Sequence, residues 1–496
     1  MDRSSGILMH ISSLPSNYGI GTFGEEAYKF VDFLKKSGQT YWQILPLGHT
    51  GYGDSPYQCF SAFAGNPFFI DLDFLVMDGL IDTSDLQEIN FNDSRVDFSK
   101  LYNSRYVILR KAYKNFRTNS NFNDYEEFKR NNNFWLEDYS MYMALKFYFD
   151  GKSLMEWEDN IKFRTEESMA YYKEILSDEI EFWNFIQYKF FSQWKQLKNY
   201  INANGIQVIG DIPIYVSLDS SDVWANSKIF KLNENRIPYT VSGCPPDEFS
   251  ITGQLWGNPI YDWEYLDKTN YQWWIERINE GLKLFDILRI DHFRGFESFW
   301  EIPYGNKTAE FGKWTKGPGI KLFNAVKQQI KNLNVIAEDL GYLTEEVIDF
   351  RNETGFPGMK ILQFGFSDRK CGNEHTPYNY SNNCVVYTGT HDNDTIRGWI
   401  EVTGNKDDVK FIEEYLNLNN EEGYNWGVIR GAWASVANVS ITMMQDLLNL
   451  GNESRMNFPS TVGKNWTWRI NKNDINEQLS NKLYDITKLY GRCKND

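Results

Sequence analysis

Eight short runs of apolar residues recur along the chain, and segments with helical periodicity separate most of them. Strands that alternate with helices predict a parallel sheet. Eight such strands favour a closed (β/α)₈ TIM barrel over an open sheet, because a closed barrel has no edge strands to protect. The runs span residues 6–14, 41–48, 206–216, 285–291, 334–339, 360–366, 384–392 and 439–446.

Two of the intervening segments show the expected amphipathic helix followed by a glycine that can end it. The first helix precedes Gly38 and the second precedes Gly205. Their apolar faces consist of Ala27, Phe30, Val31 and Leu34, and of Phe190, Trp194, Leu197 and Ile201.

Two gaps between the strands are too long for simple crossovers. Residues 70–180 are helical and crowded with Tyr and Phe, and residues 217–270 are rich in Asn, Pro and Gly. We interpret residues 1–496 as a single catalytic barrel domain that carries a mainly helical insertion (70–180) and a loop-rich insertion (217–270) over the C-terminal face of the barrel.

The composition excludes several classes of partner. A net charge of -16 disfavours nucleic acids, whose affinity for proteins comes largely from Lys and Arg. No run of about 18 apolar residues predicts a membrane span, and the N-terminus does not resemble a signal peptide. The five cysteines are odd in number and scattered, so we expect free thiols in a cytoplasmic protein that is a monomer or a weak homo-oligomer.

Charged residues lie at the ends of three of the apolar runs. Side chains alternate along a strand, so Arg289 and Asp291 share a face, where the guanidinium would keep the carboxylate ionised. The next run ends in Glu338 and a later one ends in His391 and Asp392. Any one of these acids could form an ordinary structural ion pair, but three at the C-terminal ends of separate strands favour catalysis.

Two carboxyl groups on opposite sides of an acetal suffice for glycoside chemistry. Asp291, which has an arginine beside it, is the natural nucleophile, and Glu338, which has no neighbouring cation in the sequence, is the natural acid. We expect their carboxyl groups to lie roughly 5 to 5.5 Å apart, the spacing of a retaining pair.

The motifs "DILRIDHFRGF", "VIAEDLG" and "VVYTGTHDNDT" resemble those of the amylomaltases, the 4-α-glucanotransferases related to the α-amylase clan. "GILMHISSLPSNYGIGTFG", "GDSPYQCFSAFAGNP", "GQLWGNPIYDW" and "SRMNFPSTVGKNWTWR" extend the resemblance over nearly the whole chain. It implies transfer of α-1,4-glucan segments to another glucan or to glucose by double displacement, without metal or organic cofactor.

The resemblance also implies roles for single residues. Asp291 would be the nucleophile, Glu338 the acid/base and Asp392 the third acid, which holds sugar hydroxyls. Arg289 and His391 would assist them, and Tyr57 and Trp256 would contact sugar. Core packing is the alternative for both aromatic residues, and it is the stronger alternative for Trp256. Asp211 would support the barrel floor, and alternation could point His292 away from the site.

Residues 243–259 resemble the family's loop that covers the groove and excludes water. Glu248 stands where many relatives have an aromatic residue, and Cys244 stands where a small aliphatic one is common, which puts the ratio of transfer to hydrolysis in doubt. Two alternatives remain at this point: an α-glucan hydrolase, and a glucan-binding protein without catalysis.

Overall fold

A closed barrel of parallel strands forms the centre of the computed structural model, which describes residues 1–86, 94–119, 122–246, 250–341, 343–367 and 372–494. Within these residues eight strands close the ring in the order β1-β12-β11-β10-β9-β6-β3-β2. Their bounds are β1 (Ser4–Leu8), β2 (Tyr41–Gln43), β3 (Gln207–Ile212), β6 (Ile287–Ile290), β9 (Val335–Ala337), β10 (Gly358–Ile361), β11 (Cys384–Tyr387) and β12 (Val439–Met443). Each lies within or overlaps one of the eight predicted runs, and the predicted (β/α)₈ barrel is confirmed.

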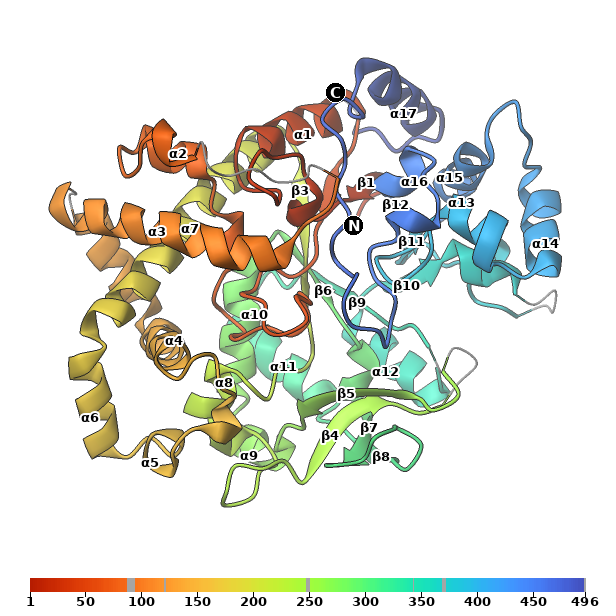
Figure 1. The fold of residues 1–496 in the computed structure, drawn as a ribbon. Coiled ribbons are helices and arrows are strands. Elements are labelled where there is room, and N and C mark those ends of the chain that lie inside the picture. The colour runs from red at the N-terminus through yellow and green to blue at the C-terminus, as the bar shows by residue number, and fades with distance from the viewer. Residues whose placement is uncertain (87–93, 120–121, 247–249, 342, 368–371, 495–496) are drawn as a thin grey trace.

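Helices surround the barrel (Figure 1). The two helices predicted from their apolar faces are present: α1 (Glu25–Lys36) and α7 (Ser177–Ala203) bury those faces. The glycines behind them, Gly38 and Gly205, adopt φ values of 70° and 76°, a conformation that side chains with a Cβ disfavour. Further helices after barrel strands β3 to β12 are α10 (Gln272–Leu284), α11 (Ile320–Gln329), α12 (Glu345–Thr354), α13 (Ile396–Gly398), α14 (Lys406–Leu416), α15 (Tyr424–Ala434), α16 (Met444–Leu447) and α17 (Glu477–Leu489).

The long connection between β2 and β3 is helical. It holds α2 (Leu72–Met77), α3 (Phe98–Asn119), α4 (Asn123–Tyr148), α5 (Asp159–Lys162) and α6 (Glu166–Ile175) before α7 begins. Aromatic contacts join α4 to α7: the rings of Trp135 and Phe191 lie 5.7 Å apart, and those of Tyr125 and Tyr188 lie 5.4 Å apart. Much of the high aromatic content therefore packs this helical layer.

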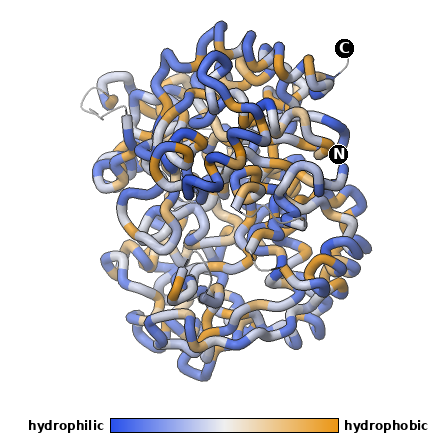
Figure 2. The backbone as a smooth tube through the Cα atoms, turned by 90° about the vertical axis from the view of Figure 1, so that its right-hand side faces the viewer, coloured by the Kyte–Doolittle hydropathy of each residue, from blue (hydrophilic) through white to orange (hydrophobic). Residues whose placement is uncertain are grey.

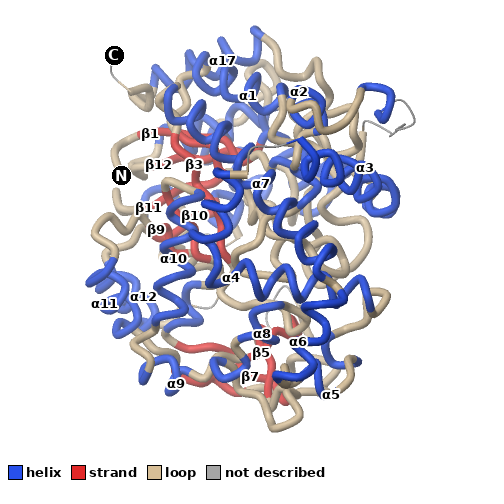
Figure 3. The backbone as a smooth tube through the Cα atoms, turned by 90° about the vertical axis from the view of Figure 1, so that its left-hand side faces the viewer, coloured by secondary structure: helices blue, strands red, loops and turns tan. Residues whose placement is uncertain are grey.

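A second, antiparallel sheet lies apart from the barrel, below it in Figure 1 and Figure 3. Its strands are β4 (Thr240–Cys244), β5 (Gln254–Pro259), β7 (Ser298–Pro303) and β8 (Lys313–Lys316), paired in the order β5-β4-β7-β8. The short helices α8 (Ser221–Ala225) and α9 (Trp263–Lys268) flank its first hairpin in sequence. This sheet was not predicted from the sequence, and it combines residues from before and after β6.

Apolar side chains of the barrel strands are withdrawn from water. Leu288, Ile290, Ile336, Val385 and Ile441 are each 0% exposed. Hydrophilic segments are frequent along the outline of the molecule (Figure 2). Within the described residues, no helix is both long and apolar enough to cross a lipid bilayer.

Candidate active site

The pairing of β3 with β6 places Arg289 beside Asp211 and next to Asp291, the candidate nucleophile. Asp211 on β3 pairs with Arg289 on β6, and Asp291 comes directly after β6. Arg289 Nη1 donates to Asp211 Oδ2 at 2.6 Å and to Asp291 Oδ1 at 2.9 Å. Burial raises the pKa of Asp291 to about 6, although Arg289 acts in the opposite direction. The carboxyl group is therefore mostly ionised at neutral pH.

The carboxyl group of Glu338 accepts hydrogen bonds from two main-chain N–H groups. The N–H of His292 donates to Oε2 and the N–H of Leu340 donates to Oε1, both at 2.7 Å. His292 adopts a left-handed backbone, with φ 49° and ψ 47°, which costs free energy for a residue with a Cβ. Burial raises the pKa of Glu338 to about 7, a value suited to a group that both donates and accepts a proton near neutrality.

Asp392 lies in the loop after β11, next to His391. The His391 Nε2 to Asp392 Oδ2 distance is 3.3 Å. Burial acts to raise the pKa of Asp392, but His391 and Asn457 outweigh it and lower the pKa to about 2. Burial acts to lower the pKa of His391, and Asp392 reverses this, so that its pKa is raised. The pair therefore favours an anion beside a cationic imidazole.

Tyr57 joins the two ends of this site. Its hydroxyl donates to Asp211 Oδ2 at 2.8 Å, and its ring stacks on His391 with centroids 5.0 Å apart. Trp466 packs against both rings, at 5.9 Å from Tyr57 and 5.8 Å from His391. Tyr57 is 334 residues away from His391 along the chain, yet it lies among the predicted acids.

Trp256 reaches the site from β5. Its ring meets the ring of His292 edge to face, at a centroid distance of 4.7 Å. His292 is 9% exposed, and burial lowers its pKa to about 3, so the imidazole is neutral. The structure therefore brings together all seven sequence-predicted residues, Asp291, Glu338, Asp392, Tyr57, Arg289, His391 and Trp256, through direct contacts or one shared neighbour.

Two polar residues that the sequence analysis did not single out hold Asp392. Asn457 Nδ2 donates to Asp392 Oδ1 at 2.6 Å, and its main-chain N–H donates to the His391 carbonyl at 3.1 Å. Arg455 Nη2 donates to the carbonyl of Asp392. The motif "SRMNFPSTVGKNWTWR" contains Arg455, Asn457 and Trp466, so its polar residues were the available signal.

The loop that the sequence analysis assigned as a cover joins β4 to β5. Cys244 ends β4 and Gln254 begins β5. Glu248 lies outside the described residues, so its predicted effect on acceptor binding stays a prediction. Among the described residues, no cluster of three or more His, Cys, Asp or Glu side chains could hold a metal ion.

This arrangement can act on an acetal by general acid and nucleophilic catalysis. An ionised carboxylate beside a guanidinium and a protonatable carboxyl group lie at the ends of β6 and β9, two neighbouring strands. The Asp392 and His391 pair and the aromatic rings of Tyr57 and Trp256 offer hydroxyl acceptors, donors and stacking faces to a sugar.

Comparisons of the sequence and of the structure with known proteins point to the same family. The sequence profile of a family described as 4-alpha-glucanotransferase matches residues 9–475. The chain is 58% identical to a 4-alpha-glucanotransferase of Clostridium butyricum over 489 residues, covering 98% of this chain and 100% of the relative. It is 51% identical to a 4-alpha-glucanotransferase of Streptococcus pneumoniae, covering 99% and 97%. Among solved structures, the amylomaltase from Streptococcus agalactiae in complex with acarbose matches with a TM-score of 0.97 and 45% identity, covering 99% and 100%.

Proposed function

Since the chain belongs to the 4-alpha-glucanotransferase family, we propose that it transfers a segment of an α-1,4-glucan to the 4-hydroxyl of another glucan or of glucose. The observation that carries this proposal lies at the C-terminal ends of β6, β9 and β11, where Arg289 holds Asp291, two N–H groups hold Glu338, and His391 holds Asp392. The acarbose complex of the Streptococcus agalactiae amylomaltase supports a sugar ligand.

In the first half of the proposed reaction, Asp291 attacks the anomeric carbon while Glu338 gives its proton to the departing glycosidic oxygen. Arg289 keeps the attacking carboxylate ionised at neutral pH. The released chain leaves, and a glucosyl-aspartate ester remains. The raised pKa of Glu338, about 7, leaves a useful fraction of it protonated for this step.

In the second half, Glu338 is a carboxylate and takes the proton from the 4-hydroxyl of the acceptor as that oxygen attacks the same carbon. The ester to Asp291 breaks and a new α-1,4 bond forms with retained configuration. The N–H groups of His292 and Leu340 stabilise the anionic form of Glu338 during this half. A separation of about 5 to 5.5 Å between the two reacting carboxyl groups is expected for this mechanism.

The other residues would hold the sugar. Asp392 accepts from sugar hydroxyls, and His391, whose pKa Asp392 raises, donates to one. Tyr57 presents its ring to the reacting sugar while its hydroxyl stays on Asp211. Trp256 contacts a further sugar across the ring of His292.

Incubation of the purified protein with maltotriose tests the proposal. Transfer yields glucose together with maltopentaose and longer chains, whereas an α-glucan hydrolase yields shorter products only. A glucan-binding protein without catalysis would leave maltotriose intact, and either of these outcomes contradicts the proposal. We further propose that the protein works in the cytoplasm and that it is a monomer or a weak homo-oligomer. Light scattering of the purified protein tests the oligomeric state.

A further inference from the structure

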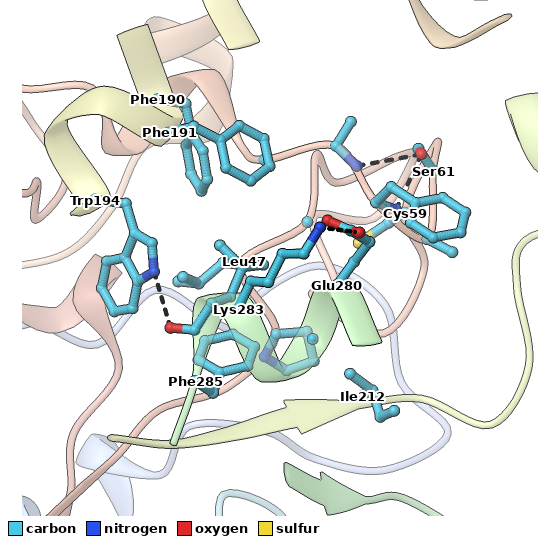
Figure 4. Close-up of a pocket in the computed structure, with 18 of the residues that line it drawn as sticks. Leu47, Cys59, Ser61, Phe190, Phe191, Trp194, Ile212, Glu280, Lys283 and Phe285 are labelled. Atoms are coloured by element: carbon cyan, nitrogen blue, oxygen red, sulfur yellow. Dashed lines mark hydrogen bonds and ion pairs between the residues drawn. The ribbon is translucent and has the colours of Figure 1, made fainter. Parts of the chain in front are cut away.

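The candidate active site borders an apolar cavity of about 550 Å³ between α7 and α10 (Figure 4). Tyr57 and Asp211 are among the residues that line it, so this cavity is continuous with the site already described. His391 and Asp392 do not line it. The loop that carries them, residues 388–396, is instead hydrogen-bonded to the segment that follows β12.

One buried side chain joins the two ends of this loop. Asp446 lies on α16, the short helix after β12, and it is 1% exposed. Its Oδ2 accepts from the hydroxyl of Thr388 at 2.7 Å, and its Oδ1 accepts from the main-chain N–H of Ile396 at 2.8 Å. Thr388 follows β11 directly, and Ile396 begins α13. The two ends of the loop therefore share one carboxyl group.

Both contacts of Asp446 are withdrawn from water. Thr388 is 0% exposed and Ile396 is 1% exposed. Burial raises the pKa of Asp446 to about 7, and the two hydrogen bonds act in the opposite direction. A buried carboxyl group without donors is costly, so the structure is most stable when both donors stay in place. Asp446 thus fixes the position of Thr388 relative to Ile396.

Other contacts hold the middle of the loop. Asn452 Nδ2 donates to Asp394 Oδ2 at 2.7 Å, and the main-chain N–H of Asn457 donates to the His391 carbonyl at 3.1 Å. These donors come from residues 452–457, further along the chain than Asp446. The ends and the middle of the loop are therefore held by different parts of the segment after β12.

The ends of the loop lie close in sequence to its functional residues. Two residues separate Thr388 from His391, and three separate Asp392 from Ile396. The His391 Nε2 to Asp392 Oδ2 distance is 3.3 Å. Because the connections are so short, a movement of either end would displace this pair.

We propose that Asp446 is a positioning residue of the transfer reaction, which holds Thr388 and Ile396 so that His391 and Asp392 meet the reacting sugar. This inference rests on the proposed function, in which Asp392 accepts from sugar hydroxyls. Asp446 acts through the loop, since its own side chain is buried. A misplacement of about 1 Å at a reacting group can lower a rate about 100-fold.

Two substitutions of Asp446 test the hydrogen bonds. Asp446→Ala removes both acceptors and should lower the initial rate of glucose release from maltotriose about ten- to hundredfold. Asp446→Asn should keep most of the activity, since its amide oxygen can accept from Ile396 while its amide nitrogen donates to Thr388. The Thr388 hydroxyl can then turn its proton toward the Thr442 hydroxyl, 3.1 Å away. Equal losses in the two variants would contradict the proposal.

Asp71 provides a matched control outside the site. It is 4% exposed, and its carboxyl group also accepts from a threonine hydroxyl and a main-chain N–H, those of Thr22 at 2.5 Å and Phe74 at 3.1 Å. Asp71→Ala should lower Tm, as Asp446→Ala does, but should leave turnover unchanged. Equal losses of turnover in the two alanine variants would show a general effect of instability and overturn the proposal.

The pKa of His391 gives a second measurement that does not depend on turnover. NMR titration of protein with labelled histidine rings, with the His391 signals assigned from His391→Gln, measures this pKa, which Asp392 raises. Asp446→Ala should lower the pKa of His391, because the loop no longer holds the imidazole beside Asp392, and Asp71→Ala should leave it unchanged. An unchanged pKa in Asp446→Ala would overturn the proposal.

The two measurements separate this inference from the proposed function. A wild-type protein that fails to transfer maltotriose contradicts the proposed function, and the pKa of His391 still decides whether Asp446 positions the loop. If Asp446→Ala does not fold, Thr388→Val takes its place, because it keeps the side-chain shape and removes one donor. Wild-type values of both turnover and the His391 pKa in Thr388→Val would then overturn the proposal.

Discussion

Replacing Arg289 by methionine would test how the site holds its charges. Arg289 is 4% exposed and bridges Asp211 at 2.6 Å and Asp291 at 2.9 Å. The side chain of Asp211 is 1% exposed, so without the guanidinium its carboxylate stays buried, and the Tyr57 hydroxyl is its one remaining side-chain donor among the described residues. Removing one partner of a buried ion pair costs about 3 to 5 kcal/mol.

The size of the effect on melting follows from chain length. An unfolding entropy of about 2.1 cal/mol/K per residue gives about 1 kcal/mol/K for 496 residues, so Arg289→Met should lower Tm by about 3 to 5 °C. Differential scanning calorimetry measures this. The pKa of Asp291 should also rise, since Arg289 acts to lower it, and activity should then require a higher pH.

A matched control is the ion pair of Arg397 with Glu401, at 3.0 Å, in which both side chains are about half exposed. Exposed pairs contribute about 0 to 1 kcal/mol, so Arg397→Met should change Tm by about 1 °C at most. Adding Asp211→Asn to Arg289→Met should restore part of the lost stability, because it removes the uncompensated charge. Equal melting of Arg289→Met and Arg397→Met would refute the reasoning.

Three further predictions concern turnover. Asp291→Asn should abolish glucan transfer while maltodextrin affinity, measured by calorimetry, stays close to that of the wild type; comparable turnover would contradict the nucleophile assignment. The pH profile of kcat/KM should be bell-shaped: activity falls below about pH 6 as Asp291 takes up a proton, and above about pH 7 as Glu338 loses one, whereas a flat profile across this range would speak against the pair. Asn457→Ala removes a 2.6 Å hydrogen bond to the half-exposed carboxylate of Asp392, so kcat should fall about tenfold with both pH limbs in place, and an unchanged kcat would show that Asn457 does not position this acid.

Strand positions were predictable because each barrel strand is an apolar run between helices, and strand-end acids such as Asp291 and Glu338 follow such runs directly. Parallel register then brings Arg289 beside Asp211, although 78 residues separate them. The support of Asp392 by Asn457 was not predictable in this way, because it depends on how a loop 65 residues further along folds back. The antiparallel sheet was also missed, since β4 and β7 pair across the whole of β6 and α10.

The two kinds of support within the site differ in how they can change during evolution. Glu338 is held by main-chain groups, which every residue except proline provides, so most single mutations at His292 or Leu340 keep the donor itself. Asp392 relies on the side chains of His391 and Asn457, each of which one nucleotide change can replace. Divergence among descendants of this chain should therefore alter the binding of sugar hydroxyls by Asp392 before it alters proton transfer by Glu338.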